Sequence, residues 1–136
     1  MKTRTIRQTV HFSASSHDVY ELLMDHRKHA SFTGGAVKIS RKVGGSFSVF
    51  DGYATGKNIE LTADKKIVQS WRASDWVIGV FSEVSFTFSE TPTGCTLRFI
   101  HSGVPSDQFT AIKQGWIDFY WNPMKESLKN AKKRRI

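Results

Sequence analysis

Histidine and cysteine side chains are the first candidates in this sequence for binding a metal ion, because both residue types ligate zinc and iron. His26 and His29 are three positions apart, so they could share one face of a helix. No third ligand follows at metal-binding spacing, and Cys95, the only cysteine, falls in a distant predicted strand. The pattern therefore predicts no metal site, and a single cysteine allows no disulfide within the chain.

Catalytic groups are equally sparse. Asp25 directly precedes His26, but no serine or cysteine nucleophile motif accompanies the pair, and neighbouring residues on a helix point apart. His101 continues the inward-facing row of a predicted strand, where we expect a buried histidine bonded to a hydroxyl rather than a general base. Gly34-Gly35 and Gly44-Gly45 lack the strand–loop–helix context of a phosphate-binding loop. The sequence predicts neither an enzyme nor a cofactor site.

The formal net charge of +8 has two sources. One is the C-terminal end, where residues 129–136 carry five basic groups and no acid; we expect residues 130–136 to form a mobile basic tail. The other is a segment without carboxylates between Asp25 and Asp51. Its five basic residues, the basic cluster, are Arg27, Lys28, Lys38, Arg41 and Lys42. They form either a solvated loop region or a contact surface for an acidic protein. Aromatic-rich basic motifs for RNA are missing, so no nucleic-acid partner is predicted.

Two tryptophans stand five positions apart in KKIVQSWRASDW, residues 65–76. Residues five apart in a regular strand point to opposite faces, so Trp71 and Trp76 cannot both face the main core. We expect Trp71 to point inward beside Trp116. We expect Trp76, in a hairpin or bulge at the strand end, to face a partner, because tryptophan is enriched in interface hot spots.

The hydrophobic periodicity predicts the elements that position these residues. Residues 4–12 alternate as an edge strand, a helix follows Ser15 or Ser16, and a second short helix ends at Gly34-Gly35. Period-two patterns then predict strands at residues 37–39, 47–49, 59–61, 67–74, 81–89 and 95–99. After Pro105, large apolar residues recur every three or four positions, which indicates a long helix that Pro123 should kink near Phe119.

This order of elements predicts one α+β domain over residues 1–136, with a curved antiparallel sheet of about six strands wrapped around the long C-terminal helix. Apolar and polar residues alternate at the N-terminus, so this segment lacks the apolar stretch of a secretion signal. The longest apolar run, residues 76–81, is far shorter than the roughly 20 residues that cross a bilayer. We therefore expect a soluble, cytoplasmic protein.

Five segments carry a family resemblance: GGSFSVFDG (44–52), KKIVQSWRASDW (65–76), SEVSFTF (82–88), SGVP (102–105) and QGWIDFYW (114–121). In this order and spacing they closely resemble the C-terminal domain of the activator of the heat-shock-protein-90 ATPase. The resemblance runs from about Thr9 to Leu128. It implies the helix-grip fold of the START-like (SRPBCC) superfamily, whose members often enclose a cavity for an apolar ligand.

The resemblance implies a co-chaperone-like module that binds the heat-shock-protein-90 chaperone and stimulates its ATPase. The full eukaryotic co-chaperone carries an additional N-terminal anchoring domain, and this chain starts in the C-terminal-type domain, so we expect weak stimulation. The expected contacts are the basic cluster and the loop around Trp76. The alternative is a START-like protein that holds a small apolar ligand. Its expected cavity lining is Trp71, Phe86, Phe99, Trp116 and Tyr120. This bulky aromatic set argues for a filled interior and favours the co-chaperone hypothesis.

Overall fold

The computed structural model describes residues 2–134 of the 136-residue chain, with side chains described through residue 130. Its strands are β1 (Thr3–Phe12), β2 (Lys38–Ile39), β3 (Ser46–Val49), β4 (Ala54–Thr62), β5 (Lys66–Ala73), β6 (Ser82–Thr91) and β7 (Gly94–Pro105). Its helical segments are α1 (Ser16–Met24), α2 (His26–Thr33), η1 (Ser106–Gln108), α3 (Phe109–Trp116), η2 (Ile117–Trp121) and α4 (Asn122–Arg134). Most of the predicted mobile tail lies outside the residues described in full, so its mobility stays a prediction.

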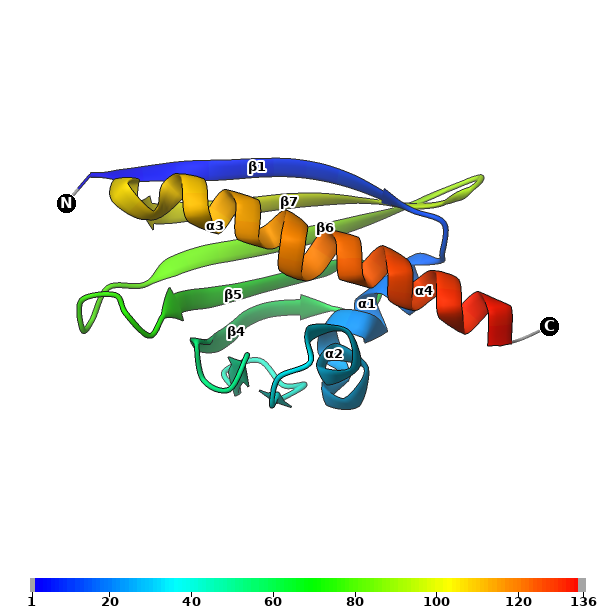
Figure 1. The fold of residues 1–136 in the computed structure, drawn as a ribbon, viewed down its shortest axis with the longest axis horizontal. Coiled ribbons are helices and arrows are strands. Elements are labelled where there is room, and N and C mark those ends of the chain that lie inside the picture. Colours follow the sequence, from blue (N-terminus) through cyan, green and yellow to red (C-terminus); the bar gives the residue numbers. More distant parts are fainter. Residues whose placement is uncertain (1, 135–136) are drawn as a thin grey trace.

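The strands form one antiparallel sheet in the order β1-β7-β6-β5-β4-β3-β2. The C-terminal helical segments run across one face of this curved sheet, and α1 and α2 lie at one end of it (Figure 1). The predicted α+β helix-grip arrangement is confirmed, including the two short helices after the first strand. Over residues 2–134 the sheet has seven strands, where about six were expected.

The two short helices begin and end where the sequence supplies caps. The Ser15 hydroxyl accepts a hydrogen bond from the backbone N–H of Asp18 at 3.1 Å, which satisfies a free donor in the first turn of α1. The Asp25 carboxylate does the same for α2, accepting from two backbone N–H groups. Gly34 ends α2 with φ at +76°, a left-handed conformation that glycine adopts without steric cost.

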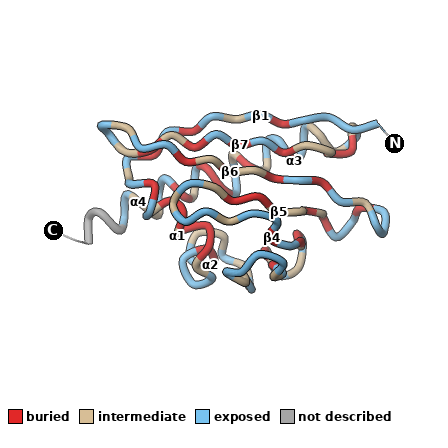
Figure 2. Tube along the Cα trace, turned by 180° about the vertical axis from the view of Figure 1, so that it is seen from behind, coloured by how far each residue is buried: buried red, intermediate tan, exposed pale blue. Residues whose placement is uncertain are grey.

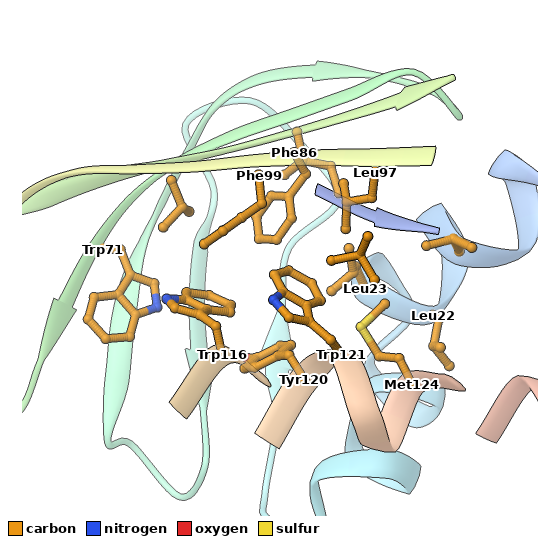
Figure 3. Packing of buried hydrophobic residues seen from close by; sticks show 14 of the residues in the cluster. Leu22, Leu23, Trp71, Phe86, Leu97, Phe99, Trp116, Tyr120, Trp121 and Met124 are labelled. Atoms are coloured by element: carbon orange, nitrogen blue, oxygen red, sulfur yellow. The ribbon is translucent and has the colours of Figure 1, made fainter. Parts of the chain in front are cut away.

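The core lies between the sheet and the C-terminal helix. Buried positions alternate with more exposed ones along the strands, as Figure 2 shows. Val84, Phe86 and Phe88 point inward from β6, and Leu97 and Phe99 from β7. Aromatic rings from the helix fill the space opposite these strands (Figure 3). The strand face and the helix stripe therefore share one continuous apolar interior.

The long C-terminal helix contains a π-helical turn, η2, at residues 117–121. The backbone N–H of Asn122 donates to the carbonyl of Ile117, five residues back, instead of four as in an α-helix. Pro123 has no backbone N–H to donate to the carbonyl of Phe119. The irregularity predicted near Phe119 is therefore present, as a helical turn that contains one added residue. The wider turn stacks Trp116 on Trp121, with ring centroids 5.7 Å apart and planes 20° from parallel.

Candidate functional site

A chain of buried hydrogen bonds connects the C-terminal helix to the middle of the sheet. Trp116 Nε1–H donates to His101 Nδ1 at 3.0 Å. Because that nitrogen accepts, the neutral ring carries its proton on Nε2, which lies 2.7 Å from the Ser82 hydroxyl. The hydroxyl donates in turn to the carbonyl of Trp71 at 2.7 Å. The predicted buried histidine bonded to a hydroxyl is confirmed. Burial lowers the pKa of His101 from 6.5 to about 3.

His29 is held in the same manner. Its Nδ1 lies 2.9 Å from the carbonyl of Leu23, to which it donates, and its Nε2 lies 3.0 Å from the Tyr120 hydroxyl, from which it accepts. Burial lowers the pKa of His29 from 6.5 to about 4, and burial raises the pKa of Tyr120. Nε2 therefore joins α2 to the C-terminal helix and Nδ1 joins it to α1, which leaves neither ring nitrogen for a metal ion.

His26, the other half of the metal-like pair, is exposed on α2 while His29 is buried. Cys95 is buried in β7, and desolvation raises the pKa of its thiol, which disfavours the reactive thiolate. Among the residues that the structure describes, no three histidine, cysteine or acidic side chains gather in a metal-binding arrangement. None of the described helices has the length and apolar character needed to cross a membrane.

The basic cluster is exposed and divides between two neighbouring regions. Arg27 and Lys28 lie on α2, Lys38 in β2, and Arg41 and Lys42 in the loop after it. Helix α2 and the segment from β2 to β3 lie side by side at one edge of the molecule (Figures 1 and 2). The five exposed cations therefore come from neighbouring backbone segments.

One member of the cluster is already paired. Arg41 Nη2 donates to the carboxylate of Glu21 on α1, and this bond raises the pKa of Arg41. Within the described residues, Lys38 and Lys42 form no ion pair. The two lysines are therefore the cluster residues of this region most available to an acidic surface.

Trp76 is not on the surface. Only 6% of it is exposed, and its ring packs edge-on against Trp71 with centroids 5.4 Å apart. The expectation that Trp76 faces outward is wrong because the strand ends at Ala73 and the chain turns, with the Trp76 N–H bonded to the carbonyl of Ala73. The turn breaks the two-residue alternation and brings Trp76 back to the core side. Trp71 faces inward beside Trp116, as predicted, with centroids 6.0 Å apart (Figure 3).

The residues after Trp76 are the exposed ones. Val77, Ile78 and Phe81 are 70%, 94% and 54% exposed, in the loop that extends from one end of the sheet between β5 and β6 (Figure 1). We call residues 76–81 the tip loop. Arg72 in β5 holds the start of this loop, because its guanidinium donates to the carbonyl of Trp76 at 2.7 Å. A buried indole and an arginine thus hold three apolar side chains toward solvent. The sequence contained the signal, the apolar run 76–81, but its buried member could not be identified from the pattern.

An apolar pocket of about 320 Å³ opens between the C-terminal helix and the β3–β4 region. Trp71, Trp116 and Tyr120 line it, as the ligand hypothesis expected. Phe86 instead faces a much smaller space of about 20 Å³ behind these rings. Phe99 lines neither space, because it packs against Trp116 and Trp121 with centroids 4.4 and 5.1 Å away.

The pocket mouth contains residues that the sequence pattern did not single out. Phe50 and Tyr53 come from the turn after β3, and Phe119 from η2. Phe50 has φ at +52°, an uncommon conformation for a residue with a side chain, and its ring lies 6.0 Å from that of Phe119. An Asp-Gly pair such as Asp51-Gly52 is typical of a turn, but it does not tell which side chain points inward.

Comparison of sequences matches the chain to a protein family. The model described as Activator of Hsp90 ATPase homolog 1-like protein matches residues 13–129. The chain is 33% identical over 115 residues to the activator of 90 kDa heat shock protein ATPase homolog of Dictyostelium discoideum, covering 84% of this chain and 30% of that protein. It is 26% identical over 123 residues to the human activator homolog 1, covering 90% and 36%. The chain thus spans about a third of the length of these relatives.

Comparison of structures finds the same fold. An HSP90 activator from Plasmodium falciparum superposes with a TM-score of 0.84 at 23% identity, over 93% of this chain and 96% of that one. The Aha1 dimer from Colwellia psychrerythraea gives a TM-score of 0.74 at 18% identity, over 85% and 90%. At these identities the likeness establishes the fold alone.

Proposed function

Because the chain belongs to the family of Activator of Hsp90 ATPase homolog 1-like proteins, we propose that it is a co-chaperone-like module that docks on a heat-shock-protein-90 chaperone and stimulates its ATPase. The observation that carries the proposal is the family match over residues 13–129, which includes both exposed surfaces described above. The chaperone activity itself is taken from the names of the relatives, so binding by this chain is the proposed step.

Two surfaces support docking by different physical means. The basic cluster supplies charge, which attracts an acidic partner and speeds association more than it adds affinity. The tip loop supplies Val77, Ile78 and Phe81, which replace Trp76 as the proposed apolar contacts. Exposed apolar residues grouped on a held loop are typical of interaction sites, because burying them against a partner removes them from water.

We expect stimulation by this segment alone to be weak. It corresponds to about a third of the length of its named relatives, and separating linked binding modules can cost roughly 10²–10⁴ in overall avidity. The test is a titration of the cognate chaperone with the full chain, with ATP hydrolysis as the readout. The proposal expects stimulation at high concentration that decreases as salt is added, since the Debye length falls below about 10 Å above 0.1 M salt. An unchanged ATPase rate at saturation, shown by a parallel binding assay, would overturn it.

The pocket favours a second candidate function, the binding of a small apolar ligand. Its volume of about 320 Å³ is at the lower end of the range of small-molecule sites, roughly 300–1,000 Å³. A ligand that binds only the folded protein would raise the melting temperature. A screen of apolar compounds by thermal shift tests this function without the chaperone. If no compound stabilises the protein in such a screen and the chain stimulates the ATPase, the ligand-binding function is rejected and the co-chaperone proposal stands.

A further inference from the structure

The loop that carries Arg41 and Lys42 is fastened to the sheet by one buried side chain. Asn58 in β4 is 2% exposed, and its amide nitrogen donates to the carbonyls of Ser40 and Lys42 at 2.7 and 3.0 Å. Its amide oxygen accepts from Gln69 Nε2 at 3.0 Å, which fixes the orientation of the amide group. Both N–H donors of the Asn58 side chain therefore hold the loop, and its oxygen is bonded to β5.

The backbone adds to this attachment. Gly44 N–H donates to the carbonyl of Asn58 at 2.8 Å, and Asn58 N–H donates to the carbonyl of Gly45 at 2.9 Å. A Cβ atom placed on Gly45 would lie 2.0 Å from the Ser40 hydroxyl, so the loop closes too tightly for any other residue there. We call residues 40–45 the clamped loop. Its conformation is set by the protein before any partner arrives.

The clamped loop presents Lys42 and Val43 to solvent, with Val43 64% exposed. Three carboxylates of the neighbouring segments accept hydrogen bonds from other groups of the protein. Glu21 binds Arg41, and Asp25 accepts from the N–H groups at the start of α2. Asp51 accepts from the N–H of Ala36 at 2.7 Å. These bonds leave the carboxylate charges in place, but within the described residues Lys42 forms no ion pair with any of them.

We propose that the clamped loop is a preorganised recognition site for an acidic protein segment that carries an apolar side chain, and that Asn58 is its positioning residue. Lys42 meets the acidic groups, Val43 the apolar one, and Asn58 keeps both in place without touching the partner. Preorganisation strengthens binding because the ordering of the loop is not a cost of association. This inference rests on the proposed function, and it adds a chemical class of partner segment and the residue that shapes the site.

The test is binding of a short fluorescent peptide of alternating glutamate and leucine to the full chain, followed by anisotropy. We expect Lys42→Gln to weaken binding about 2- to 5-fold and to reduce its salt dependence, as for an exposed ion pair. Val43→Ser should weaken binding with the salt dependence unchanged. The matched control is Arg98→Gln, an exposed cation in β7 outside the loop, which should bind like the wild type. Equal affinities of the Lys42 and Arg98 variants would overturn the proposal.

The positioning role of Asn58 is tested by the affinity for the peptide and its salt dependence, because a merely structural residue would not change the affinity of a variant that still folds. Asn58→Ala should lower peptide affinity about 2- to 10-fold by freeing the loop, while the salt dependence stays at the wild-type value because no charge is removed. If that variant does not fold, Gln69→Ala carries the same test, since it removes the bond that orients the Asn58 amide. Wild-type affinity in the folded variant would overturn the positioning role.

The other anionic partners are outcomes of the same assay. A single-stranded RNA or a phosphatidylserine vesicle that displaces the peptide from Lys42 and binds more tightly would overturn the assignment to a protein segment. The result is separable from the proposed function, because peptide binding needs no chaperone. Chaperone stimulation that is insensitive to Lys42→Gln, with no peptide binding, would reject this site and leave the proposed function standing.

Discussion

The indole N–H of Trp116 donates to Nδ1 of His101 at 3.0 Å, and this single bond requires the histidine to be neutral. A protonated ring would carry a hydrogen on Nδ1 that points at the indole hydrogen, so both groups would be donors. The bond therefore joins the packing of the C-terminal helix to the protonation state of a residue in the sheet.

We predict that acid destabilises the fold. Burial lowers the pKa of His101 to about 3 and of His29 to about 4, whereas both titrate near 6.5 when unfolded. Below pH 6.5 the unfolded chain takes up protons that the folded chain refuses, so stability is complete above 6.5. It is lost as pH falls toward 4 and 3, by up to about 1.4 kcal/mol per pH unit for each histidine. Urea melts between pH 7.5 and pH 4 measure this slope. A flat stability profile in the wild type would contradict the prediction.

We predict that Trp116→Ala costs about 3–5 kcal/mol of unfolding free energy, the range for buried aromatic truncations. Trp116 is 4% exposed and its loss also leaves His101 Nδ1 without a donor. Thr110→Ala, on the exposed side of the same helix, should change stability by less than about 0.5 kcal/mol. A urea melt compares the two variants, and a loss below 1 kcal/mol for Trp116→Ala would show that the indole is not part of the core.

We predict that two substitutions of Gly115 have separate effects, one on the stability of the protein and one on the volume of the pocket. A Cβ atom there would first meet Phe119 Cδ2 at 3.7 Å, an ordinary contact, so Gly115→Ala should stabilise the helix by about 0.5–1 kcal/mol. Gly115→Leu projects a larger side chain into the pocket that Gly115 lines and should abolish any thermal shift caused by an apolar ligand. Calorimetry with and without the ligand measures both effects. An undiminished shift in the leucine variant would place the ligand elsewhere.

We predict that neighbouring tip-loop residues have opposite roles. Ile78→Asp should change stability by less than about 0.5 kcal/mol, because the side chain is 94% exposed, but should weaken chaperone binding about tenfold as a hot-spot loss of about 1.4 kcal/mol. Trp76→Ala should lower stability by about 3 kcal/mol or more because the indole is buried. Melts and binding titrations of both variants separate these effects. Unchanged binding by Ile78→Asp would remove the tip loop from the proposed interface.

The fold could be predicted from the sequence because each element carried its own periodic signal. The inward rows of β6 and β7 and the stripe of the C-terminal helix need no knowledge of distant residues. The caps at Ser15 and Gly34 were equally local. The short strand predicted at residues 37–39 is found as β2, Lys38–Ile39, paired with β3.

The candidate site was less predictable because it depends on turns. Trp71 faces inward as expected, but alternation alone did not decide between the two tryptophans, and the turn at Ser74 and Asp75 reverses the side to which Trp76 points. Phe50 enters the pocket through a left-handed backbone conformation that no apolar pattern encodes. Asn58 attaches the clamped loop through bonds to residues that lie 16 and 18 positions away in the sequence. An asparagine in a strand gives no sign of such partners.

The π-helical turn has a consequence for insertions and deletions in this chain. Residues 117–121 hold one residue more than an α-helical turn would, so Trp116 and Trp121 stack at a separation of five positions. The segments α3 and α4 are thereby out of phase with each other. Deleting one residue here would restore an ordinary helix and turn every side chain of α4 by about 100° relative to α3. His29 and its bond to Tyr120 lie at this junction, so α2 would lose the partner that docks it. A single codon thus sets the phase between the two halves of the longest helix.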